Sequence, residues 1–261
     1  MDIDWIVTLW SALVVVVATT VHGITGFGTG QITMGVLPFF RDAASASIVV
    51  SIVVFITNLR VFWSVRDEFN WKDWIIPVAG LAIGLPIGIY LYGSWDEHQL
   101  RVAIGVVMMI GAVVILLLRQ IKWIREWIKG TGWQPGWISG VLAGFLSGIS
   151  GGAVSIPGPP MIIYGAFLME TDYWTVKQMK AIFTSFFAAN LLYRIVVLTS
   201  MGQMTAEIAV EALAIVPALF LGSWLGIKLF NVMSLAILRW FITTFIFVLG
   251  SLATVGSLKG Q

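Results

Sequence analysis

The sequence predicts an all-α polytopic membrane protein with two inverted-topology repeats of about five helical segments each, in which glycine-rich helices are broken or re-entrant. Three observations predict this fold class. The chain has 261 residues, of which 59% are hydrophobic and 11% are charged, whereas a soluble domain is about 25% charged. Apolar runs near the roughly 20 residues that one membrane crossing needs recur along the whole chain. Two similar glycine-rich stretches interrupt these runs, one in each half.

Apolar runs and helix breakers divide a single transmembrane domain, 1–261, into two repeats and a linker. The first repeat covers about 5–118 and the second about 137–256. The polar stretch 119–136 is expected to be the linker, and its composition suits a short amphipathic helix on the membrane surface. The sequence leaves open whether the first two segments of each repeat cross fully or form a re-entrant hairpin. The expected segments are 5–22, 27–40, 44–64, 74–92, 99–118, 137–150, 153–168, 175–200, 206–229 and 234–256.

The two halves share glycines, a proline and an asparagine in the same order, which indicates an internal duplication. A shift of 122 residues superimposes the glycine-rich stretches, and the shift grows to 132 and then 138 further along, as longer loops in the second half would require. The matched pairs are Gly26 with Gly148, Gly30 with Gly152, Pro38 with Pro160, Thr25 with Ser147, Asn58 with Asn190, Gly84 with Gly222 and Gly88 with Gly226.

The distribution of lysine and arginine predicts the orientation. When alternate loops are assigned to the cytoplasm, 11 of the 15 Lys and Arg residues lie on that side, and the positive-inside rule favours this arrangement, with the N-terminus outside. An odd number of segments per repeat then turns the second repeat upside down relative to the first, as in many secondary transporters. The cytoplasmic groups are Arg60 to Lys72, Arg119 to Lys129, Lys177 with Lys180, and Lys228 with Arg239; Arg41, Arg101, Arg194 and Lys259 lie on the other side.

Two stretches cannot continue as helix at membrane depth: "GITGFGTGQITMGVLP" (23–38) and "GFLSGISGGAVSIPGPP" (144–160). Proline removes a helix donor and clashes with the preceding turn, and irregular backbone survives in the membrane only when it is buried in protein or lines a polar cavity. Each break exposes a helix N-terminus with about half a positive charge, and two converging N-termini attract an anion. The predicted substrate-binding residues are Thr25, Gly26, Gly28, Thr29, Gly30, Gln31, Asn58, Ser147, Ser150, Gly151, Gly152, Ser155 and Asn190.

Three further side chains are expected at the vestibules or gates of this site. His22 immediately precedes the first break, and Arg60 and Arg194 follow the paired asparagines. Arginines in these places would concentrate anions at each mouth, and they suit snorkelling to lipid headgroups equally well. The asparagines either line the substrate path or hold neighbouring helices together.

Four glycines, Gly140, Gly144, Gly148 and Gly152, are spaced by four residues. Such a ridge of small residues lets two helices pack closely. It suits packing within the chain and packing in a homodimer equally, so the sequence leaves the oligomeric state open. The partners we expect are membrane lipid and a small anionic substrate.

The residue inventory excludes most other classes of function. The chain has no cysteine and two histidines, and its apolar segments contain no acid pair, so we expect no catalytic residue, metal site or cofactor and therefore no enzyme. The sequence "GFGTG" lacks the spacing and the strand–helix context of a nucleotide-binding loop. Because the cations lie in loops that set orientation, we expect no nucleic-acid partner.

The glycine-rich stretches 23–38 and 144–160, carried by two similar halves joined by a basic loop, resemble the TauE/SafE sulfite exporter family over nearly the whole chain. The resemblance implies a multi-pass protein of the inner membrane that moves sulfite, a sulfonate such as sulfoacetate, or a related sulfur-containing anion. It points to residues 23–31 and 147–157 as the substrate region. Two rival functions remain open on the residues: an anion channel, and a cation-coupled importer that holds Na⁺ at exposed carbonyls.

Overall fold

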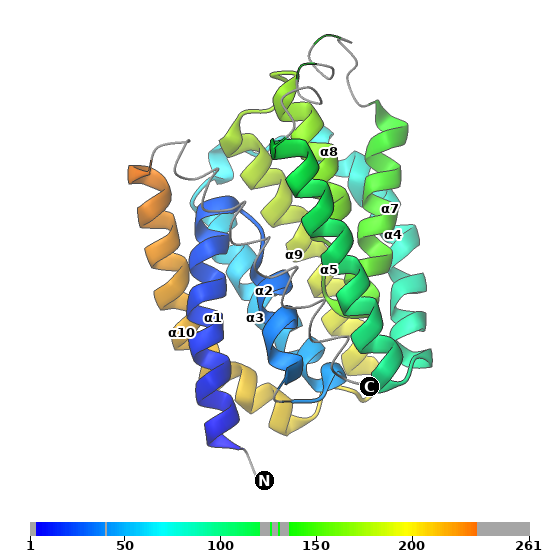
Figure 1. Ribbon diagram of the computed structural model, residues 1–261, viewed down its shortest axis with the longest axis vertical. Helices are drawn as coiled ribbons and strands as arrows, with labels where there is room; N and C mark the ends of the chain where they lie inside the picture. Colours follow the sequence, from blue (N-terminus) through cyan, green and yellow to red (C-terminus); the bar gives the residue numbers. More distant parts are fainter. Residues whose placement is uncertain (1–3, 40, 121–125, 127–129, 131–135, 234–261) are drawn as a thin grey trace.

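The computed structural model describes residues 4–39, 41–120, 126, 130 and 136–233, and this part of the chain is helical with no strand. The expected tenth segment, 234–256, and most of the linker lie outside the described residues. The arrangement of the helices is shown in Figure 1. The helices are α1 (Trp5–Thr25), α2 (Thr29–Val36), α3 (Ala43–Trp63), α4 (Trp71–Ser94), α5 (Glu97–Gln120), α7 (Trp137–Val154), α8 (Gly158–Glu170), α9 (Val176–Ser200) and α10 (Ala206–Val232), with 3-10 turns at Leu37–Phe39 and Arg66–Glu68.

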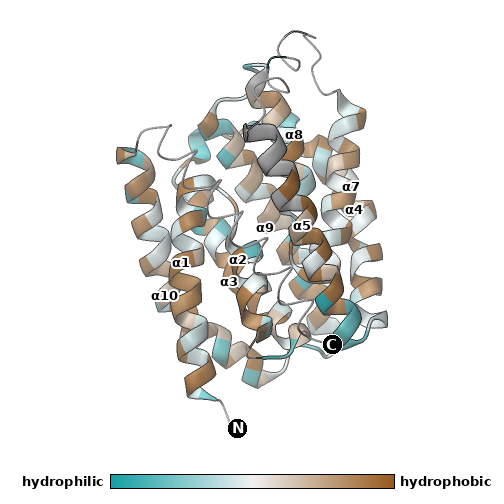
Figure 2. Ribbon diagram, viewed as in Figure 1, coloured by the Kyte–Doolittle hydropathy of each residue, from teal (hydrophilic) through white to brown (hydrophobic). Residues whose placement is uncertain are grey.

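Within the described residues, six helices, α1, α3, α4, α7, α9 and α10, are long and apolar enough to cross a membrane. At 1.5 Å per residue, α2 with 8 residues and α8 with 13 residues span only about 12 and 20 Å, less than the roughly 30 Å hydrocarbon core. The second segment of each repeat is therefore a half-helix that turns back beside a longer first helix. Figure 2 shows hydrophobic residues along most of the helix lengths and hydrophilic residues gathered toward the ends of the bundle.

Most helices that begin at the ends of the bundle are capped by side chains, but the two half-helices are not. Asp4 and Asp42 accept hydrogen bonds from the first turns of α1 and α3, and Thr175 forms a capping box with Gln178 at the start of α9. No side chain caps α2, α8 or α7, of which α7 begins at an end of the bundle. Because the first N–H groups of a helix have no partner within it, the two half-helices keep donors at mid-depth that side chains satisfy in α1, α3 and α9.

Two helix pairs pack with their backbones in close contact through glycine. A Cβ atom added to Gly84 would collide with the carbonyl of Phe145, so α4 lies directly on α7. A Cβ atom added to Gly226 would lie 2.8 Å from Cα of Gly23, which places α10 equally close to α1. Figure 1 shows these two pairs on opposite flanks of the bundle. The glycine ridge of α7 therefore packs against α4 of the same chain.

The two glycine contacts correspond residue by residue. A shift of 138 residues relates the glycines of α4 to those of α10, Gly84 to Gly222 and Gly88 to Gly226. A shift of 129 relates the α1 residues that face the α10 glycines to the α7 residues that face the α4 glycines. The corresponding α1 and α7 residues are Val16 with Phe145, Thr20 with Ile149, and Gly23 with Gly152. In each pair the first helix of one half lies on the fourth helix of the other half, which is the packing that a two-fold relation between the halves would produce.

This correspondence corrects the shift of 122 residues expected for the glycine-rich stretches. Under that shift Gly26 matched Gly148, but Gly148 lies inside α7 against the backbone of Gly84 and Leu85. With the shift of 129, Gly26 matches Ser155, and both residues end a helix in the left-handed conformation. In the sequence the two halves were aligned on glycine, an abundant residue type in this chain. In the fold they align on the residues at which α1 and α7 end. The duplication itself stays a prediction.

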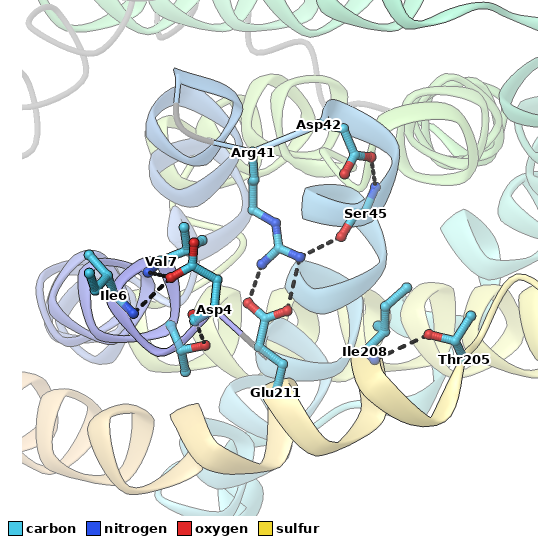
Figure 3. Close-up of polar contacts among 10 residues, drawn as sticks. Asp4, Ile6, Val7, Arg41, Asp42, Ser45, Thr205, Ile208 and Glu211 are labelled. Carbon is cyan, nitrogen blue, oxygen red and sulfur yellow. Dashed lines mark hydrogen bonds and ion pairs between the residues drawn. The ribbon is translucent and has the colours of Figure 1, made fainter. Parts of the chain in front are cut away.

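A polar layer joins the first half to α10 at the end of the bundle where the chain starts (Figure 3). The Arg41 guanidinium, in the loop before α3, forms an ion pair with Glu211 of α10 and also donates to Ser45. Both charged side chains are largely buried, at 9% and 13% exposure. A partly buried, bidentate pair of this kind fixes orientation more firmly than an exposed one.

We predict that Gly84→Ala destabilises the protein, because the new methyl group would collide with the Phe145 carbonyl at the α4–α7 contact. Overpacking of this kind costs about 1–3 kcal/mol. Thermal unfolding in detergent measures the effect. Gly93→Ala on the same helix is the control, since its added methyl group would meet only the flexible end of Met201 at 3.5 Å. Equal stability of the two variants would contradict the packing described above.

Candidate functional site

The two broken helices stop at residues with left-handed backbone. Gly26 (φ 81°) and Gly28 (φ 109°) flank the first break, and Ser155 (φ 60°) ends α7 at the second. Glycine adopts this conformation without steric cost, whereas a non-glycine residue there needs support from its surroundings. The Ser155 hydroxyl has that support, since it donates to Ser47 O at 3.0 Å and lies 2.9 Å from the Ser51 hydroxyl. The second break is therefore held in place by α3.

Both breaks line the same cavity. Its wall also includes Val54, in the middle of α3, and Phe187, in the middle of α9, so the cavity lies at mid-depth in the bundle. Its volume is about 20 Å³. A cavity needs about 10–15 Å³ to hold one water molecule, so this cavity is large enough for a single water. The site is thus a small chamber. The lining residues are His22, Phe27, Gly28, Gly30, Gln31, Val54, Ser155, Ile156, Pro157, Gly158 and Phe187.

The absence of side chains lets the two breaks touch. A Cβ atom on Gly30 would lie 2.7 Å from the Ser155 carbonyl oxygen, and one on Gly158 would lie 2.5 Å from Nε2 of Gln31. Real Cβ atoms almost never approach this closely, so both positions require glycine for the observed geometry. Convergence of the two breaks is built into the backbone.

The first turns of both half-helices line this chamber, α2 through Gly30 and Gln31 and α8 through Gly158. The first N–H of α2 with a backbone acceptor is that of Ile32, which donates to Gly28 O at 2.9 Å. The N–H groups of the preceding three residues, Thr29 to Gln31, belong to the uncapped first turn. At α8, Pro159 and Pro160 carry no N–H, which leaves Gly158 as the donor of the first turn. Uncapped donors at two helix N-termini favour negative charge.

Several buried side chains near the breaks carry polar atoms without a hydrogen-bond partner in the described part of the chain, as Ser11, Arg41 and Trp74 do elsewhere. Both ring nitrogens of His22, Oδ1 of Asn58, both amide atoms of Asn190, and the hydroxyl of Ser147 have none within the described residues. His22 lines the chamber, and the Asn58 side chain lies close to its ring. Buried polar groups are normally paired, so these unpaired groups mark a place where a polar ligand or water is accommodated.

His22 and Gly151 occupy corresponding positions under the shift of 129, and each faces one of the paired asparagines. The Asn190 amide packs directly over Gly151, where an added Cβ atom would lie 2.5 Å from Nδ2. In the first half the corresponding position carries the His22 ring, which lies beside Asn58. The site therefore has an imidazole on one side only.

Arg194 is fully buried and binds a backbone carbonyl at the second break, in the last turn of α7. Its guanidinium donates to Gly152 O at 2.8 Å, to Ser47 O at 3.1 Å, to the Ser47 hydroxyl at 2.7 Å, and to the Ser51 hydroxyl. Its predicted place at a vestibule is corrected, because its residue exposure is 0%. The serines of α3 and the free carbonyl at the end of α7 give it more hydrogen bonds than a headgroup position would.

Lys180 is buried in the same way at the first break, with 1% exposure. Its ammonium donates to Gly23 O at 2.6 Å, and its stem packs against Gly26. The sequence assigned this lysine to the cytoplasmic side together with Lys177. Helix α9 begins at Val176, close to the expected segment 175–200, so Lys180 lies in its second turn, where the side chain is buried in the bundle.

Apart from Arg194, the predicted site residues separate into four groups. Gly28, Gly30, Gln31 and Ser155 line the chamber together with His22. The Thr25 hydroxyl is used within its own turn, donating to Phe27 O at 2.5 Å. Arg60 is half-buried in the last turn of α3. The remaining residues surround the breaks without lining the chamber: Gly26, Thr29, Asn58, Ser147, Ser150, Gly151, Gly152 and Asn190.

Sequence reasoning missed several chamber residues. Phe27 and Ile156 lie inside the breaks and were passed over as ordinary apolar residues, and Val54 and Phe187 lie one turn or less from the asparagines. The useful signal was the single lysine inside the apolar run that follows the Thr175 cap. A lysine within a membrane helix normally needs an interior partner.

No group of three or more His, Asp or Glu side chains that could hold a metal ion occurs within the described residues. The described carboxylates lie in loops or in the first two or last turns of helices, and none lines the chamber. The polar groups of the chamber are therefore backbone amides, Gln31, Ser155 and His22.

The fold and the converging half-helices define a multi-pass helical membrane protein with an enclosed polar site. The model of the family "Sulfite exporter TauE/SafE" matches residues 11–252, nearly the whole chain. The chain therefore belongs to the TauE/SafE sulfite exporter family, a family of membrane transporters. No curated protein and no solved structure matches the chain.

We predict that Gly30→Ala weakens anion binding by about tenfold, or ~1.4 kcal/mol. The added methyl group would meet the Ser155 carbonyl at 2.7 Å and push the two breaks apart. Binding is measured as the shift in unfolding temperature against anion concentration. Gly93→Ala, far from the breaks, is the control and should bind as the unmodified protein does. Unaltered binding by Gly30→Ala would show that contact between the breaks is not needed for the site.

Proposed function

We propose that this chain is a secondary transporter that moves a small sulfur-containing anion, sulfite or an organosulfonate such as sulfoacetate, by alternating access. The substrate binds in the mid-depth chamber between the two breaks. Its oxygens accept hydrogen bonds from backbone N–H groups of α2 and α8 and from the Gln31 amide. The substrate class follows from the family together with the chemistry of the chamber.

One observation carries the proposal: both breaks line one chamber that offers hydrogen-bond donors and no carboxylate. A cation site built at broken helices uses carbonyl oxygens or acids as ligands. Here the carbonyls of Gly23 and Gly152, at the ends of α1 and α7, already accept from Lys180 and Arg194. The chamber therefore suits an anion better than Na⁺. Its small volume fits a closed state, from which alternating access requires opening toward one face at a time.

The proposed orientation, with the N-terminus outside an inner membrane, is supported by the charges at the two ends of the described bundle. The end where α1 starts carries many more acids than bases, whereas bases and acids are equal in number among the residues named below for the opposite end. Basic residues favour the cytoplasmic side, so the opposite end is the relatively basic one. At the first end lie Arg41 and Arg101 with Asp4, Asp42, Asp96, Glu97, Glu207 and Glu211; at the other lie Arg60, Arg66, Lys72, Lys177 and Lys228 with Asp67, Glu68, Asp73, Glu126 and Asp172.

A thermal-shift screen of the purified protein against sulfite, sulfate, sulfoacetate, taurine and carboxylate analogues tests the substrate class. A ligand that binds the folded state raises its unfolding temperature by mass action, so we expect a larger shift with sulfur oxyanions than with carboxylates. Indifference to every anion would contradict the proposal. Flux into proteoliposomes with Na⁺ replaced then distinguishes a cation-coupled importer, and flux that does not saturate would indicate a channel.

We predict that Asn58→Ala and Asn190→Ala still insert into the membrane but transport about tenfold more slowly, with a cost of ~1.4 kcal/mol in the transport barrier. Each variant removes a buried amide beside the breaks with polar atoms left unpartnered among the described residues, Oδ1 in Asn58 and both amide atoms in Asn190. Initial rates in proteoliposomes measure the effect. Asn70→Ala is the matched control: it removes the N-cap of α4 at the end of the bundle, which costs about 1 kcal/mol of stability and leaves the substrate path intact. Normal flux through both site variants would remove these asparagines from the path.

A further inference from the structure

Each break brings two helix ends of opposite polarity close together. The C-terminal end of a helix carries about half a negative charge, and the N-terminal end about half a positive charge. At the first break three residues separate the end of α1 from the start of α2, and at the second break three residues separate the end of α7 from the start of α8. If nothing else acted on an anion in the chamber, the opposite fields of the two helix ends at each break would largely cancel. Something must neutralise the C-terminal ends for the N-terminal donors to determine the sign of the chamber.

A buried cation lies at each of these C-terminal ends. Lys180 Nζ donates to Gly23 O, and Arg194 Nε donates to Gly152 O. These carbonyls belong to corresponding residues, because the shift of 129 that relates them is set by the independent contacts of α1 with α10 and of α7 with α4. The two cations thus occupy corresponding places at the ends of the two broken helices.

Each cation also lies over an aromatic ring, and the two rings occupy corresponding positions. Lys180 Nζ lies 3.8 Å from the centre of the Phe230 ring on α10, and the Arg194 guanidinium lies 4.9 Å from the centre of the Tyr92 ring on α4. Adding 138 to Tyr92 gives Phe230, the shift that also relates the glycines of α4 and α10. A cation over an aromatic ring is stabilised by the negative face of the ring.

The two cations come from unrelated positions of one helix. Lys180 and Arg194 are both on α9, 14 residues apart, or about 21 Å along the helix axis. They differ in residue type, yet the charged group of each lies between a helix-terminal carbonyl and an aromatic ring, in corresponding surroundings. The feature common to the two sites is therefore the positive charge. Neither cation pairs with a carboxylate in the described part of the chain, so their charge is free to act on the chamber.

We propose that Lys180 and Arg194 are positioning residues that neutralise the C-terminal ends of α1 and α7, so that the N-termini of α2 and α8 make the chamber selective for anions in proportion to the anion's charge. This inference rests on the proposed function. A buried charge without a partner is costly, and an anion in the chamber supplies the missing negative charge. Cations and substrate then stabilise each other.

The test compares two sulfur oxyanions of different charge, methanesulfonate and sulfate, binding to the full-length protein at constant ionic strength. The variants are Lys180→Gln, which keeps a donor for Gly23 O but removes the charge, and Lys180→Arg, which keeps the charge. Lys228→Gln is the matched control, because Lys228 is an exposed cation on α10 whose field is screened by solvent and salt.

Coulomb energy is proportional to the charge of the ligand, so we expect Lys180→Gln to weaken methanesulfonate by about tenfold and sulfate by about a hundredfold. Lys180→Arg should preserve the ratio of the two affinities, and Lys228→Gln should leave both affinities unchanged. Equal weakening of the two anions by Lys180→Gln, or none, would overturn the inference while leaving the proposed function intact. Failure of the unmodified protein to bind either anion would overturn the proposed function.

Arg194→Gln provides the second variant, since it removes the other charge from corresponding surroundings, and it should show the same dependence on ligand charge. Its four hydrogen bonds make it the less tolerant position. If both glutamine variants fail to fold even with saturating sulfate, the cations serve the fold alone and the inference is wrong.

Discussion

The structure depends on what happens to backbone hydrogen-bonding groups where two helices stop inside an apolar bundle. In hydrocarbon each unpaired N–H or C=O group costs several kcal/mol, so an interruption survives only if every freed group finds a partner. The freed carbonyls at the ends of α1 and α7 are bound by buried cations of α9. The freed N–H groups at the starts of α2 and α8 are left for a ligand. This division of partners, with carbonyls satisfied by the protein and amides left open, gives the chamber its sign.

Close packing around the breaks keeps this arrangement in place. Glycine contacts hold α1 against α10 and α7 against α4, so that the long helices cannot drift apart when the half-helices move. The half-helices are short and uncapped, and they touch each other through glycine and one serine carbonyl. The alternating access that we propose would then have a physical basis: helix pairs formed between the two halves surround a small centre in which the half-helices meet.

The sequence predicted the fold class, the breaks and most helix bounds, because apolar length, proline and glycine act locally. It predicted the wrong match between the two halves, since glycine is so common here that Gly26 found a partner in Gly148, whereas the backbone conformation of Ser155 identifies the true counterpart. It also misplaced Lys180 and Arg194. Both cations contact carbonyls that are brought to them by tertiary packing, Gly23 lying 157 residues before Lys180, and no local pattern carries that information. His22 was recognised as adjacent to the break, but only the structure shows that it lines the chamber.

The most direct test of convergence around an anion is anomalous diffraction from crystals of the full-length protein grown with selenate, a heavier analogue of sulfate. The account predicts a selenium peak between the two breaks, within hydrogen-bonding distance of the N–H groups of Gly30 and Gly158. A peak found only at the protein surface, or a map in which unbroken helices pass through residues 26–28 and 155–157, would contradict it.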